Sequence, residues 1–128
     1  MPDPKTIMVL GLEPSLLDFS DPALANRGID AAKIGAALER DAASLNALGH
    51  HAELCLTDTG ETAEAVVRAR LVEKAFDFVV IGAGIRTVPR YFLLFEKLIN
   101  VVHEHAPRAR ICFNTKPDDT AEAVSRWL

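Results

Sequence analysis

Strand-like and helix-like segments alternate along this chain, and the alternation restricts its possible folds more than any other feature. Short segments with the pattern of buried strands cover residues 6–10, 51–56, 76–81 and 110–113. The longer segments between and after them combine regularly spaced apolar residues with helix-start signals, and they cover residues 30–48, 61–75, 88–105 and 118–128. A strand followed by a helix, repeated along the whole chain, predicts an α/β fold.

The alternation also predicts how the strands are arranged. Helical crossovers join parallel strands, and right-handed connections leave few possible strand orders. We expect a three-layer αβα sandwich around a four-stranded parallel sheet of order 2-1-3-4, which is the flavodoxin-like (Rossmann-like) type. The first and last helices then cover one face, and the second and third helices cover the other. The order 3-2-1-4 is the alternative.

The composition fits one α/β domain over residues 1–128. Hydrophobic residues make up 49% of the chain and charged residues 25%, which excludes disordered and collagen-like proteins. A chain of this length buries about two-thirds of its unfolded surface, so it needs neither a metal nor a disulfide to fold. Cys55 and Cys112 lie inside predicted strands, and we expect both to be buried free thiols.

Charge and hydropathy exclude several partners. The net charge of −4 and the pI near 5.5 leave no basic stripe for nucleic acid. The longest apolar run covers only residues 91–95, which is too short to cross a membrane. The first residues are polar and rich in proline, unlike a signal peptide, so we expect a cytoplasmic protein.

The topology predicts where a ligand binds. Open parallel sheets hold ligands beyond the carboxyl ends of their strands, where the chain reverses its direction across the sheet. In the order 2-1-3-4 this point lies between the first and third strands. Glycines there allow close backbone approach, and arginine supplies paired donors for a carboxylate or phosphate. We therefore predict a site for a small anionic or polar ligand, made by Gly11, Glu13, Asp58, Gly82, Gly84, Arg86, Asn114 and Thr115.

Some of these residues are also explained by a structural role alone. Asp58 has the spacing of a helix-capping residue, and Thr115 with Asp118 also forms a helix-start signal. Lys116 can pair with an anion. Thr87 stands where a dinucleotide fingerprint has its third glycine, so no cofactor is indicated. No metal site is predicted, because all histidines fall at the opposite edge of the sheet (His50, His51, His103 and His105).

The first connection is unusually long. Residues 12–29 join the first strand to the first helix, whereas such loops usually take about two to six residues. The connection contains Leu16, Leu17, Phe19 and Leu24, so it is not a solvated linker. We expect it to cover the pocket as a lid or wall, with plain packing or a subunit contact as the alternative. Pro14 is expected to begin a helical turn there.

The layout from the first helix onward resembles a response-regulator receiver domain. The resemblance rests on residues 45–53, on the strand at residues 76–81, and on residues 106–111 with Thr115. Gly82 stands where a receiver has its phosphoacceptor aspartate, and Glu13 alone represents the acidic cluster. These departures from the receiver pattern argue against phosphorelay, and the chain as a whole looks most like a small bacterial flavodoxin-like α/β protein. The alternative function is a non-catalytic, receiver-like interaction module.

Two features predict a homodimer. The third helix is apolar around more than one stripe, with residues 91–95, Leu98, Ile99, Val101 and Val102. The last strand ends the sheet with no fifth strand beside it, and an uncovered apolar edge favours association. The alternative is that the last helix and Trp127 cover this edge.

Overall fold

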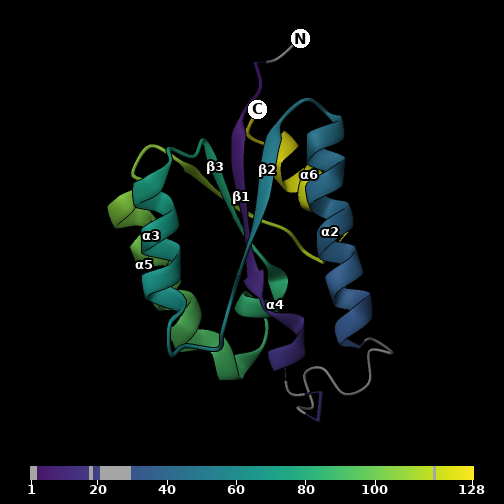
Figure 1. Ribbon diagram of the computed structural model, residues 1–128, viewed down its shortest axis with the longest axis vertical. Coiled ribbons are helices and arrows are strands. Elements are labelled where there is room, and N and C mark those ends of the chain that lie inside the picture. Colours follow the sequence, from purple (N-terminus) through teal and green to yellow (C-terminus); the bar gives the residue numbers. More distant parts are fainter. Residues whose placement is uncertain (1–2, 18, 21–29, 117) are drawn as a thin grey trace.

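The computed structural model describes residues 3–17, 19–20, 30–116 and 118–128, and it confirms the predicted sheet. The parallel strands lie in the order β2-β1-β3-β4 at the centre of the molecule (Figure 1). Their bounds are β1 (Thr6–Leu12), β2 (His51–Thr57), β3 (Phe78–Ile81) and β4 (Arg110–Phe113). The fold is therefore of the flavodoxin-like, or Rossmann-like, α/β type.

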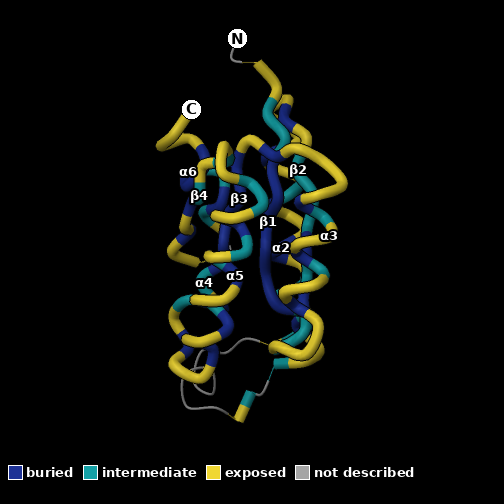
Figure 2. The backbone as a smooth tube through the Cα atoms, turned by 90° about the vertical axis from the view of Figure 1, so that its left-hand side faces the viewer, coloured by how far each residue is buried: buried dark blue, intermediate teal, exposed yellow. Residues whose placement is uncertain are grey.

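Helices cover both faces of the sheet in the predicted pairs. The first pair, α2 (Ala31–Ala47) and α6 (Thr120–Ser125), packs through Leu45, Ala123 and Val124 against one face. The second pair, α3 (Ala63–Glu73) and α5 (Phe92–His105), packs against the other face as a larger apolar cluster. Figure 2 shows that β1 and β3 are buried along most of their length, and Figure 1 shows them between these two helix layers.

The segment after β3 differs from the prediction. The sequence predicts one helix from residue 88, whereas the structure has a short helix α4 (Ala83–Arg86), a 3₁₀ turn (Pro89–Tyr91) and only then α5. Proline disfavours helical geometry in the preceding residue, and Val88 is accordingly extended. The chain therefore breaks between α4 and the 3₁₀ turn, which leaves α4 beside the carboxyl end of β3.

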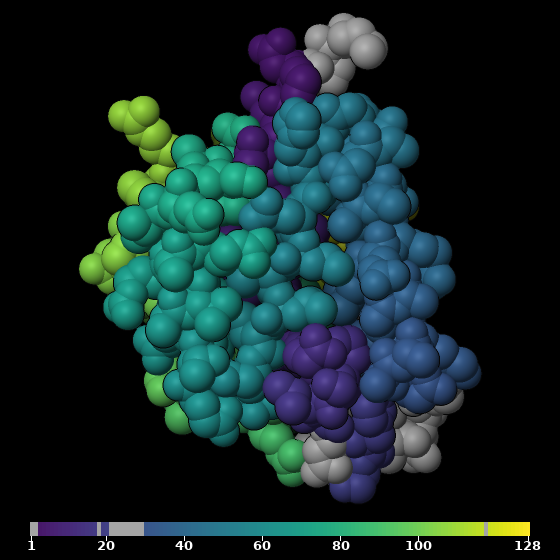
Figure 3. All heavy atoms as spheres, in the orientation of Figure 1, coloured from purple at the N-terminus to yellow at the C-terminus, as the bar shows by residue number. Residues whose placement is uncertain are grey.

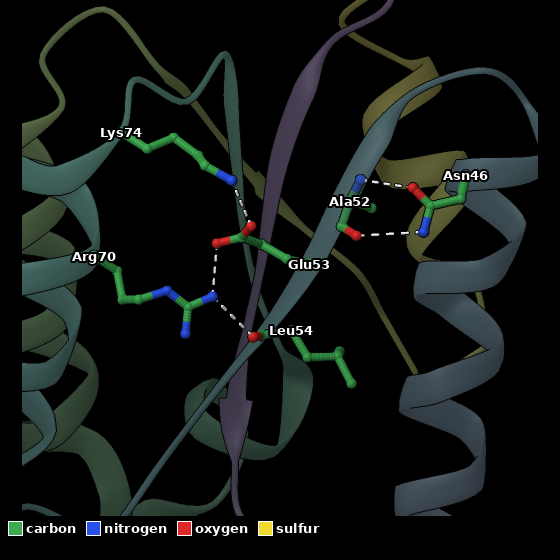
Figure 4. A network of polar contacts seen from close by, with 6 residues as sticks. All are labelled: Asn46, Ala52, Glu53, Leu54, Arg70 and Lys74. Atoms are coloured by element: carbon green, nitrogen blue, oxygen red, sulfur yellow. Dashed lines mark hydrogen bonds and ion pairs between the residues drawn. The ribbon is translucent and has the colours of Figure 1, made fainter.

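Side chains of two helices close the outer edge of β2 (Figure 4). The Asn46 side chain accepts a hydrogen bond from the Ala52 N–H at 2.8 Å and donates one to the Ala52 carbonyl at 3.3 Å. From the opposite face, Arg70 donates to the Leu54 carbonyl at 3.2 Å and pairs with Glu53. The outward backbone groups of Ala52 and the outward carbonyl of Leu54 are thus satisfied by side chains, which leaves less of this edge for another strand to pair with.

The sheet also holds both cysteines. Cys55 and Cys112 are buried free thiols, as predicted, and burial raises the pKa of each. Within the described part of the chain, no helix combines the length and the apolar character needed to cross a membrane.

Candidate functional site

A cavity of about 270 Å³ opens beyond the carboxyl ends of β1 and β3, at the point where the sheet order reverses. Its wall combines residues that are far apart in the sequence but adjacent at this edge of the sheet. They are Gly11, Leu12, Leu17, Ile34, Leu38, Gly82, Ala83, Gly84, Ile85, Thr87, Val88, Asn114, Thr115 and Lys116. Most of these side chains are apolar, and the polar ones come mainly from the segment after β4.

Glycines give this cavity its space. A Cβ atom on Gly82 would lie 3.2 Å from the carbonyl oxygen of Leu10, because the chain leaves β3 in close contact with β1. A Cβ atom on Gly84 would meet nothing within 4 Å, since this glycine faces open space. A Cβ atom on Gly11 would make ordinary contacts with Leu56 and Leu38. All three predicted glycines therefore line the cavity, and Gly84 is the one where an added side chain would meet no neighbouring atom within 4 Å.

The chain after β1 forms part of the wall. Residues Pro14–Leu16 make the predicted turn as a 3₁₀ helix, and this segment lies beside the start of α2 on the surface shown in Figure 3. Leu17, which follows the turn, lines the cavity. Leu24 and most of the rest of the expected lid lie outside the described residues, in the range 21–29.

Arg86 is turned away from the cavity wall. Its guanidinium donates to the Ile81 carbonyl at 2.9 Å, to the Asn114 carbonyl, and to the Asn114 side-chain oxygen at 3.2 Å. It also lies 4.8 Å from the centre of the Phe113 ring, and its burial lowers the pKa of the guanidinium. Arg86 therefore joins the carboxyl ends of β3 and β4, and it does not contribute to the lining of the cavity.

Asn114 connects the cavity wall to a buried polar chain. Its side-chain oxygen accepts from the Ala83 N–H at 2.8 Å, and its amide nitrogen donates to the Thr120 hydroxyl at 3.1 Å. Thr120 in turn donates to Asp41 at 2.6 Å. Asp41 is only 4% exposed, and burial is the main cause that raises its pKa to about 6.

The sequence prediction named Asn114 but missed Asp41 and Thr120. One signal was present in the sequence. Asp41 follows Leu38 by three residues and precedes Leu45 by four, so it lies on the apolar stripe of its helix. A carboxylate at such a position must find a buried partner, and Thr120 is that partner.

The two predicted carboxylates have structural partners outside the cavity. Glu13 accepts hydrogen bonds from the backbone and side chain of Ser15, at 3.4 and 3.2 Å. Asp58 accepts from the Thr62 hydroxyl at 2.7 Å and from the Gly60 N–H at 3.0 Å, and these bonds lower its pKa. The structure thus places Glu13 and Asp58 at turns near this edge of the sheet, but not on the cavity wall.

Thr115 and Lys116 form the polar side of the cavity. Thr115 is held by Asp119, which accepts from its backbone N–H at 2.9 Å and from its hydroxyl. The Lys116 ammonium lies 3.6 Å from Asp118, and both side chains are exposed. A ligand with an anionic group can therefore reach a cation at the rim while its apolar part contacts Leu12, Ile34 and the other aliphatic residues of the wall.

No protein-family model matches the chain, and no curated protein matches it in sequence. In the described residues, no three His, Cys, Asp or Glu side chains gather in a way that would hold a metal ion.

Proposed function

We propose that this chain is a binding domain for a small molecule with an apolar body and one anionic or polar group. The observation that carries the proposal is the cavity at the switch point of the sheet, where this class of fold binds ligands. An engineered cavity of about 150 Å³ holds benzene, so the larger cavity here accommodates a substituted ring or a short branched chain. Lys116 at the rim favours an anionic group on such a molecule.

A thermal-shift screen tests the proposal. Benzoate, phenyl phosphate and hexanoate serve as anionic probes, and benzamide and hexanamide serve as their neutral counterparts. A ligand that binds only the folded state at about a hundred times its Kd stabilises the protein by about 3 kcal/mol, or roughly 10 °C in a domain of this size. We expect at least one anionic probe to raise the melting temperature more than its neutral counterpart.

Gly84→Leu is expected to abolish this stabilisation, because its side chain would project into the open space that Gly84 faces. Gly84→Ala is the matched control, since it changes the same backbone position and leaves most of the cavity empty. Lys116→Met should remove the preference for anions while leaving the neutral probes unaffected. The proposal is wrong if no probe stabilises the wild-type protein, or if Gly84→Leu retains the full response.

We also propose a second candidate function, interaction through a homodimer, for which the start of α5 provides the observation. Phe92 and Leu93 are neighbours there and are 60% and 65% exposed. Two large apolar side chains at one helix end favour self-association when a second copy covers them.

Sedimentation velocity over rising protein concentration tests this dimer. We expect the double substitution Phe92→Ser with Leu93→Ser to shift the protein toward monomer. Val72→Ser, which replaces an exposed valine on α3, is the control and should leave the distribution unchanged. A wild-type protein that remains monomeric at the highest concentration would contradict the proposal.

A further inference from the structure

The two edges of the sheet differ in how many outward backbone groups are bonded by side chains. At β2, Asn46 and Arg70 bond to the outward groups of Ala52 and to the Leu54 carbonyl, and among the described residues nothing bonds to the Leu54 N–H or to the outward groups of Leu56. At β4, the Arg110 N–H donates to Asp77 beside β3, so the backbone groups of Ile111 and Phe113 point outward. Among the described residues, nothing bonds to the Ile111 N–H, the Ile111 carbonyl or the Phe113 N–H.

Positive charge and aromatic surface surround this open edge. Arg110 begins β4, and Arg126 donates to the Phe113 carbonyl at its end, at 2.8 Å. No carboxylate in the described parts of the chain pairs with either arginine, although the protein as a whole has a net charge of −4. Trp127 is 50% exposed beside Arg110, and Phe113 is 37% exposed.

We propose that the outer edge of β4 docks an extended acidic segment of a partner protein, which adds to the sheet as a fifth strand. The backbone of the segment would pair with the outward groups of Ile111 and with the Phe113 N–H, as in other cases of strand addition. Acidic side chains of the segment would face Arg110 and Arg126, so the edge would bind acidic segments in preference to basic ones. Apolar side chains that alternate with them would lie on the opposite face of the strand and contact Phe113, since Trp127 lies against Arg110.

Charge also decides against a second copy at this edge. A symmetric pairing of two β4 strands would bring Arg110 and Arg126 of both copies close together. Like charges on paired strands are destabilising, and no acidic residue of β4 offsets them. An acidic partner would bring negative charge to these arginines, whereas a second copy would bring two more arginines beside them.

The test uses the full chain and a short, end-capped peptide of alternating glutamate and valine. Trp127 is the sole tryptophan of the sequence, so its fluorescence reports directly on this edge. We expect a saturable change in Trp127 emission, weaker binding at high salt, and much weaker binding of the lysine–valine counterpart. A glutamate–valine peptide with N-methylated backbone amides should not bind, because it cannot pair as a strand.

Charge reversal at the edge provides the matched protein variants. Arg110→Glu with Arg126→Glu should lower the affinity for the acidic peptide at least about tenfold. Arg40→Glu with Arg68→Glu makes the same change in net charge on exposed helix surfaces, and it should leave the affinity within about twofold of wild type. Circular dichroism checks that both variants are folded.

Four results would overturn the inference. The first is equal binding of the acidic and basic peptides, and the second is equal loss of affinity in both pairs of variants. The third is a homodimer that disappears on charge reversal at Arg110 and Arg126, because the edge would then serve a second copy. Undiminished binding of the N-methylated peptide would show that the contact is not strand addition.

Discussion

Replacing Asn114 by alanine is expected to lower the free energy of unfolding by about 3 to 4 kcal/mol, the largest loss that we predict for a single substitution. Asn114 is 3% exposed and makes hydrogen bonds with Ala83, Arg86 and Thr120. Alanine would leave the Ala83 N–H without its acceptor and the Thr120 hydroxyl without one of its partners. Each buried polar group that loses its partner costs about 1 to 3 kcal/mol.

Urea unfolding at pH 7, followed by circular dichroism, measures this loss. Asn100→Ala is the control, because Asn100 is exposed on α5 and its side chain bonds only to the Glu96 carbonyl among the described residues. We expect the control to change the free energy of unfolding by less than about 0.5 kcal/mol. A cost for Asn114→Ala no greater than that of Asn100→Ala would show that the polar chain does not stabilise the fold.

Asp41→Asn is expected to have the opposite effect and to stabilise the protein at neutral and alkaline pH. Burial raises the pKa of Asp41 from 3.8 to about 6, with Asp118 and Asp119 adding to the rise while Thr120 and Arg40 oppose it. A pKa difference of this size corresponds to about 3 kcal/mol. Asparagine has nearly the same shape and still accepts from Thr120, but it carries no charge to bury.

The direction of the pH dependence follows from the raised pKa. Between about pH 4 and pH 6 the folded protein binds more protons at Asp41 than the unfolded chain does, so stability falls as pH rises through this window. We expect the free energy of unfolding of Asp41→Asn to exceed that of wild type by about 2 to 3 kcal/mol at pH 8. This gain should shrink toward zero at pH 4.

Urea unfolding at several pH values gives both profiles. Glu39→Gln is the matched control, since it removes a carboxylate from an exposed position on the same helix. The free energy of unfolding of Glu39→Gln should follow that of wild type at every pH, with a difference below about 0.5 kcal/mol. If the profile of Asp41→Asn also runs parallel to wild type, Asp41 does not titrate in the predicted window.

The sheet was predictable from sequence because its signals are local and redundant. The apolar run at residues 6–10 marked β1, which the structure extends to Leu12 through pairing with Thr57. Once the strands were assigned, the rules for crossovers left the order β2-β1-β3-β4 as the first choice. The short helix α4 was missed because its existence depends on the contact of Gly82 with β1 and on the break before Pro89.

The site was predictable only as far as backbone position determines it. Gly11, Gly82 and Gly84 line the cavity because the ends of β1 and β3 must meet there. Arg86 and Glu13 lie at the same edge, but their side chains follow local hydrogen bonds that sequence spacing does not reveal. Asp41 joins the buried polar chain behind the cavity wall from the middle of α2. The one sequence signal for this role is that Asp41 interrupts the apolar stripe of its helix.

The unequal edges of the sheet have a consequence for aggregation. A sheet with two open edges can grow without limit, since each added molecule presents a new edge to the next one. Here the side chains of Asn46 and Arg70 bond to three outward backbone groups of β2, so fewer of its groups remain for a new strand. Strand pairing along the whole of β2 would have to displace these side chains, which disfavours growth from both edges of the sheet at once.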